Sequence, residues 1–187
     1  TGPEKSQAGA WWSQGLDYRD RRLVIHTRLA RVASEADGLS RGGVHVPMEQ
    51  LLIQPDLFPE EHLHDPRLEW LESDGLGGFA MGTASGIRTR RYHGLLCAAR
   101  TPPTGRVMLV NAVEAWVDLG AGPRALSSHR YLPSTTHPDG AGRLVAFAHE
   151  PFPSWTYELE DGARIVQELL VPRRPAQVGV SWGFVGG

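Results

Sequence analysis

The clearest pattern in the chain is an alternation of apolar and polar residues near its carboxyl end. Trp155 and Tyr157 alternate with polar neighbours, and a second alternating run covers residues 165–171. Successive side chains of a strand point to opposite faces, so a period of two predicts half-buried strands. Asp161-Gly162 lies between the two runs and is typical of a two-residue type I′ turn. The sequence therefore predicts a β-hairpin with Trp155 and Tyr157 facing the core.

Similar short segments recur along the chain, separated by turns rich in Gly and Pro. We expect further strands at residues 69–72, 92–99, 107–119, 143–149 and 178–184. In the longest of these, Asn111 interrupts an otherwise apolar face. Many short strands with turn signals between them are typical of an all-β protein. We predict an antiparallel β-sandwich domain over residues 48–187.

The first part of the chain has a different composition. Residues 1–22 are polar with scattered charge, and residues 38–47 are rich in Gly, Ser and Pro. Residues 23–33 fit either a helix or a strand, because their periodicity does not decide. We expect residues 1–47 to be a poorly ordered leader. The first methionine is Met48 and the chain stops just after an alternating run, so we interpret it as a fragment whose sandwich is truncated at the carboxyl end.

Composition narrows the classes of function. The net charge of −2 gives no bulk reason to bind nucleic acid or an anionic membrane, and no apolar stretch is long enough to span a bilayer. Cys97 is the only cysteine, which excludes an internal disulfide and zinc sites built on several cysteines. We expect a cytoplasmic protein with no cofactor and no metal. His62 and His64 are interpreted as part of a surface turn.

The most informative segment, residues 69–96, reads EWLESDGLGGFAMGTASGIRTRRYHGLL. Its five glycines between positions 75 and 86 favour tight turns or close approach of a ligand. It lacks the spacing of a dinucleotide fingerprint or a phosphate loop. Guanidinium, phenol and imidazole groups follow at residues 88–93 and suit a sugar-facing loop or an interface. A solvated basic turn is equally compatible with the local chemistry.

Two carboxylates precede the glycines. Glu72 and Asp74 are only two residues apart, which is too close for a pair that flanks a glycosidic bond. We interpret both as surface carboxylates and expect no catalytic residue in this chain.

The segment resembles the amino-terminal domain of bacterial and archaeal-type glycogen debranching enzymes, whose pattern is approximately N-G-L-G-G-[YF]-A-x-G-T-x-x-G-x-N-T-R-R-Y-H-G-L-L. Matching residues run from Gly75 to Ala80, at Gly82, Thr83 and Gly86, and from Thr89 to Leu96. The likeness continues at residues 102–106, 137–140 and 151–157, so it spans Glu69 to Val171. Asp74 and Arg88 stand where the family usually has asparagine.

The resemblance implies a fold, an activity and a set of site residues. The family removes α-1,6-linked glucose at branch points of glycogen or related α-glucans, with its catalytic carboxylates in a following (α/α)6 barrel. The supersandwich-like amino-terminal domain packs against that barrel and helps to shape the site. The expected partners are therefore an α-glucan and the protein's own barrel. The expected substrate or interface residues are Asp74, Gly77, Gly78, Arg90, Arg91, Tyr92, His93, His137 and Asp139.

The orientation of the Arg-Arg-Tyr-His run has two possible forms. Strand alternation would turn Arg91 and His93 toward the barrel and pack Tyr92 inward. A loop would instead present all three, and Gly94 permits such a turn. We favour the first, because residues 95–99 read as a continuing strand.

Two other functions fit the same residues. One is the sandwich domain of a glucoamylase or disaccharide phosphorylase, which shares the architecture. The other is a free-standing carbohydrate-binding module. A following helical region with spaced acidic residues would exclude the module.

Overall fold

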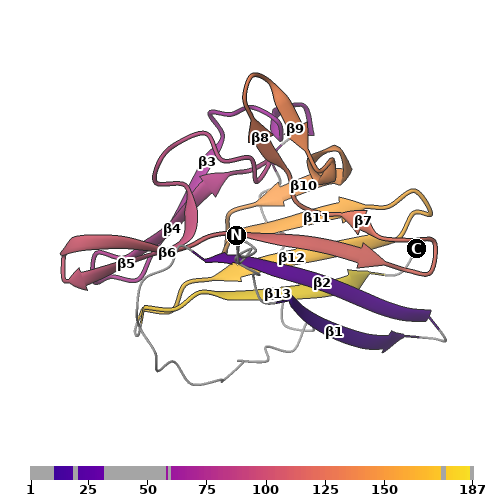
Figure 1. The fold of residues 1–187 in the computed structure, drawn as a ribbon, viewed down its shortest axis with the longest axis horizontal. Helices are drawn as coiled ribbons and strands as arrows, with labels where there is room; N and C mark the ends of the chain where they lie inside the picture. Colours follow the sequence, from indigo (N-terminus) through magenta and orange to yellow (C-terminus); the bar gives the residue numbers. More distant parts are fainter. Residues whose placement is uncertain (1–10, 19–20, 32–57, 59, 174–175, 186–187) are drawn as a thin grey trace, which may run out of the picture.

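The computed structural model describes residues 11–18, 21–31, 58, 60–173 and 176–185, and for residues 11–31 the backbone only. These residues form an antiparallel all-β protein, which confirms the predicted fold class (Figure 1). Within the described part of the chain the helical segments are two short 3-10 turns, η2 (Glu60–His62) and η3 (Gly140–Arg143).

The larger sheet contains the strands of the segment 69–96. Its strand order is β1-β2-β6-β5-β4-β3, and the short β7 pairs with β6. The strands are β1 (Trp11–Tyr18), β2 (Arg21–Arg31), β3 (Glu69–Ser73), β4 (Phe79–Thr83), β5 (Gly94–Thr101), β6 (Thr104–Asp118) and β7 (Arg124–Ala125).

The smaller sheet has four strands, which follow one another in sequence as an antiparallel meander. They are β10 (Leu144–Ala148), β11 (Ser154–Glu158), β12 (Arg164–Leu170) and β13 (Gly179–Val185). A separate hairpin of β8 (His129–Tyr131) and β9 (Thr135–His137) stands at the top of Figure 1.

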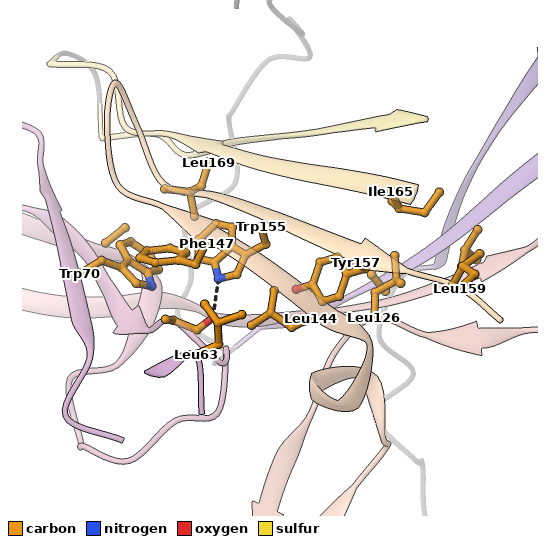
Figure 2. Close-up of a cluster of buried hydrophobic side chains, with 14 of the residues drawn as sticks. Leu63, Trp70, Leu126, Leu144, Phe147, Trp155, Tyr157, Leu159, Ile165 and Leu169 are labelled. Atoms are coloured by element: carbon orange, nitrogen blue, oxygen red, sulfur yellow. Dashed lines mark hydrogen bonds between the residues drawn. The ribbon is translucent and has the colours of Figure 1, made fainter. Parts of the chain in front are cut away.

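The core lies between the two sheets, as expected of a sandwich. Trp70 on β3 meets Trp155 on β11 edge to face at 5.4 Å between ring centroids, and Phe147 on β10 lies 5.3 Å from Trp155. Figure 2 shows these rings gathered with Tyr157 and several leucines. The Trp155 indole donates to the Ala84 carbonyl at 2.7 Å, which satisfies its only polar group in the core. Trp155 and Tyr157 therefore face inward, as predicted.

The predicted hairpin forms, but with a different turn. Leu159 N–H donates to the Ala163 carbonyl and Gly162 N–H donates to the Leu159 carbonyl, both at 2.9 Å. These bonds close a three-residue loop with Gly162 at a φ of 79°. This is the hydrogen bonding of a type I turn followed by a glycine bulge, the commonest three-residue hairpin loop. Asp-Gly favours both turns, so the dipeptide alone could not fix the loop length.

Two stretches within residues 1–47 form strands. Trp11–Tyr18 and Arg21–Arg31 form β1 and β2, and β2 pairs with β6 from Val24 to Arg31. The pairing gives β6 a partner on the side opposite to β5. For residues 23–31 the strand, one of the two alternatives that their periodicity left open, is the one observed. The remainder of residues 1–47 lies outside the described residues.

Candidate functional site

The loop between β3 and β4 is organised by Asp74, which is only 3% exposed. Its Oδ1 accepts hydrogen bonds from the backbone N–H groups of Leu76 at 2.7 Å and Gly78 at 2.9 Å. A side chain that accepts backbone bonds two and four residues ahead closes the turn in place of a strand ladder. The interpretation of Asp74 as a surface carboxylate is wrong, because this acid is buried to hold the loop.

The two glycines of this loop are required for steric reasons. Gly77 has a φ of 98°, and a Cβ placed there would lie 2.6 Å from the backbone oxygen of Pro103. A Cβ on Gly78 would contact the Asp74 carboxylate. The Gly77 carbonyl also accepts from Arg106 Nε at 2.7 Å. The loop therefore packs closely against the β5–β6 turn, and neither glycine has space for a side chain.

His93 is completely buried directly before β5. Thr89 N–H donates to its Nδ1 at 3.1 Å, which makes Nδ1 an acceptor and leaves Nε2 to donate to Glu69 Oε1, also at 3.1 Å. Burial lowers the pKa of His93, outweighing the opposite effect of Glu69. The same Glu69 oxygen lies 2.6 Å from Arg90 Nε. Glu69, which sequence reasoning missed, thus joins the two ends of the turn.

Arg91 and Tyr92 occupy the tip of that turn. His93 N–H donates to the Arg90 carbonyl at 3.2 Å, which closes a tight turn before the strand begins at Gly94. Both side chains at the tip are exposed, Tyr92 by 54%, and the Arg91 guanidinium lies 5.7 Å from the Tyr92 ring centroid. The favoured orientation is therefore wrong: Tyr92 points outward and His93 inward. The strand begins later than the apolar run indicated, so alternation does not apply here.

The remaining candidate residues lie outside the turn at residues 90–93. His137 ends β9 and is exposed, and Asp139 at the base of that hairpin pairs with Arg143 at 2.9 Å. The side-chain hydrogen bond and charge of Arg143 lower the pKa of Asp139. Within the described residues, neither side chain is bonded to the turn at residues 90–93. Glu72 pairs with His149 at 3.2 Å, and burial raises its pKa.

A cavity of about 70 Å³ lies between the sheets next to this turn. Residues of the segment 81–95 form one wall, β6 contributes residues 111–113, and the smaller sheet contributes Trp155, Tyr157 and Gln167. The loop before β8 supplies Ser127, and β8 itself supplies His129. The cavity escaped sequence reasoning because its residues come from six separate segments. Only Asn111 carried a signal, as a polar interruption of an apolar face.

The part of the chain that contains the turn and the cavity also matches a known protein family. Residues 68–187, well over half of the chain, match the family model described as glycogen debranching enzyme N terminal. The chain belongs to this family. Curated proteins and solved structures gave no match. The amino-terminal debranching-enzyme domain thus contains both the turn and the cavity, and the match starts after the predicted leader.

The two departures from the debranching-enzyme pattern keep a hydrogen-bonding role. Asp74 uses an oxygen as an acceptor, which an asparagine amide also supplies. Arg88, at the other position, donates from Nε to the His93 carbonyl at 2.8 Å, and an asparagine amide is a donor too.

The described residues contain no cluster of three or more His, Cys, Asp or Glu side chains suited to a metal ion. His62 and His64, the H-x-H pair, are both exposed. None of the helices described has the length and apolar character needed to cross a bilayer.

Proposed function

We propose that this chain is the non-catalytic amino-terminal domain of a glycogen debranching enzyme that acts on α-1,6 branch points of glycogen or related α-glucans. The domain supports and lines the active site of a following (α/α)6 barrel, where the catalytic carboxylates lie. The cytoplasm is its proposed location. The family match carries the proposal, and the exposed Arg91–Tyr92 tip on a buried anchor gives it a structural basis.

The carboxylates of segment 69–96 support a non-catalytic role. Glycoside hydrolysis uses two carboxyl groups held across the scissile bond, about 5–10 Å apart. The Oδ1 of Asp74 accepts hydrogen bonds from two backbone N–H groups, and Glu69 is bound to Arg90 and His93. These groups are committed to holding loops, so they are not available as an acid and a nucleophile.

The tip has the chemistry of a sugar contact or a domain contact. A phenol ring offers an apolar face to a sugar ring, and a guanidinium donates to hydroxyl or carboxylate oxygens. The bond between buried His93 and partly buried Glu69 fixes the turn, so little side-chain and loop ordering remains to be done on binding. A rigid, exposed and amphipathic tip therefore suits a position facing the barrel or its substrate.

Glucose release from a branched dextrin tests whether catalysis belongs to the barrel rather than to this domain. The isolated chain is expected to release none, whereas the complete enzyme releases glucose from α-1,6 branch points. Activity of the isolated chain, abolished by Glu72→Gln, would contradict the proposal. In the complete enzyme Arg91→Ala should cost about 2–5 kcal/mol in catalysis or at the interface if its partner is buried and charged.

A further inference from the structure

The cavity between the sheets lies beside a gap in the larger sheet. On one side of β6, pairing with β5 ends at Val110 and pairing with β7 begins at Trp116. Between these two pairings lie residues 111–115. On the β5 side of this segment, among the described residues, only the Ala115 carbonyl accepts a backbone hydrogen bond, from Leu126 N–H at 2.8 Å. The backbone of β6 next to the cavity therefore keeps polar groups that no neighbouring strand uses among the described residues.

Asn111 lies at this gap because of a bulge. Ala112 pairs with Ala30 and Val110 with Arg31, so Asn111 is the extra residue between them. Bulges re-aim side chains and often occur next to functional sites. Gln167 on the opposing sheet is also unusual, since it lies in phase with the buried Ile165 and Leu169. Two amides thus reach one cavity from the inner faces of both sheets.

Two further residues that line the cavity carry a buried polar atom. Within the part of the chain that the structure describes, Ser127 Oγ and His129 Nε2 have no hydrogen-bond partner. The carboxylate oxygen of Glu114 lies 3.6 Å from His129 Nε2, which is too long for a hydrogen bond. Burying such groups without partners costs free energy, so each is a place where a ligand atom can bind.

Apart from Arg88, the residues that line the cavity are uncharged and suit a ligand with hydroxyl groups. Amides and hydroxyls both donate and accept, as the hydroxyls of a sugar require. Burial lowers the pKa of His129, so its imidazole is neutral at physiological pH. The indoles of Trp70 and Trp155 add apolar surface for carbon atoms.

The volume of the cavity limits which part of a ligand can enter it. The cavity measures about 70 Å³, against the roughly 150 Å³ of a cavity that holds benzene. A whole sugar ring is too large for it, but a hydroxymethyl group with an adjoining hydroxyl is not. The cavity is open at Gly86 and Arg88, both exposed, so the ring of such a ligand can remain outside.

We infer that this cavity binds the hydroxymethyl end of a glucose unit, with Asn111, Gln167, Ser127 and His129 as its polar contacts. The choice of glucose rests on the proposed function, whereas the preference for a polyol rests on the cavity itself. The mouth lies beside the Arg90–His93 turn, because Arg88 both lines the cavity and holds the His93 carbonyl. A glucan end bound here would lie next to the Arg91–Tyr92 tip.

Trp70 and Trp155 line the cavity, so their indole N–H signals in the 187-residue chain report binding directly. Titration with glucose and with maltose should shift these signals saturably, with a Kd on the order of 1 mM. Xylose lacks the hydroxymethyl group, so it should bind at least about 10-fold more weakly, since a site built for a hydroxyl rejects analogues without it.

Two variants separate binding from folding. Ser127→Ala removes no hydrogen bond within the protein, so its melting temperature should be unchanged while affinity falls about 3–10-fold. Gln167→Leu should lower affinity, whereas Gln177→Leu, an exposed matched control, should not. No shift of the Trp70 and Trp155 signals, equal binding of xylose, or unaltered affinity of Ser127→Ala would overturn the inference. Debranching activity of the complete enzyme would then still uphold the proposed function.

Discussion

Two halves of the same glycine- and arginine-rich segment have opposite environments. The inner half comprises Gly77, Gly78, Asp74 and His93, whose contacts are with backbone and buried side chains. The outer half comprises Arg91 and Tyr92, which are exposed at the tip of a turn. Residues that look equally important in the sequence therefore have different roles. The inner half is needed for the shape of the loops, and only the outer half is free to contact another molecule.

This difference predicts that the largest loss of stability comes from the inner half. Gly77→Ala combines a positive φ with a Cβ 2.6 Å from the Pro103 backbone oxygen, so it should cost about 3 kcal/mol or more. Gly75→Ala is a matched control, because Gly75 has a φ of 74° with nothing near its Cβ, and it should cost about 1 kcal/mol. Chemical denaturation measures both. Equal costs would show that close packing of the loop is unimportant.

His93→Ala should be next in size. It leaves a cavity and removes the partners of Glu69 and of the Thr89 N–H, for a loss of about 2–4 kcal/mol. His137→Ala provides the comparison, because His137 is exposed and should change the free energy of unfolding by less than about 0.5 kcal/mol. A small effect at both positions would remove the distinction between anchor and tip.

The buried histidine also predicts a pH dependence. Burial lowers the pKa of His93 below its ordinary 6.5, against the charge of Glu69 and together with Arg88 and Arg90. Below pH 6.5 the unfolded chain binds a proton that the folded chain does not, so stability is full above that pH and declines as the pH falls. Melting temperatures between pH 7.5 and 5 should therefore decrease, and less steeply in His93→Gln. His129, whose pKa is also lowered, should account for part of the remaining slope. An identical slope in His93→Gln would contradict this assignment.

Asp74→Asn should be among the mildest changes in the inner half. The amide oxygen can replace Oδ1 as acceptor for Leu76 and Gly78, so stability should stay within about 1 kcal/mol. Asp74→Ala lacks any acceptor and should lose about 2–3 kcal/mol. Denaturant unfolding of the pair tests whether acceptance, rather than charge, is what the loop requires.

Some features of the structure could be predicted from the sequence, and others could not because they depend on contacts between distant residues. Alternation located most strands because side-chain period follows directly from strand geometry, and the family pattern identified the domain. The orientation of Tyr92 and His93 could not be predicted, since it depends on a turn closed by Glu69, more than 20 residues away in the chain. The cavity could not be predicted from the sequence for the same reason. Asn111 and Gln167 line the cavity together only because the two sheets pack against each other.

The account's central claim is that the inner half builds the fold and the outer half serves another molecule. Tyr92→Ala tests it most directly, measured in the complete enzyme for both melting temperature and kcat/KM on a branched dextrin. Tyr131→Ala, which removes a similarly exposed tyrosine from β8, is the control. We predict an unchanged melting temperature for both variants and a loss of kcat/KM of about 10-fold or more for Tyr92→Ala alone. Wild-type kcat/KM in Tyr92→Ala, or a melting temperature lowered by several degrees, would contradict the claim.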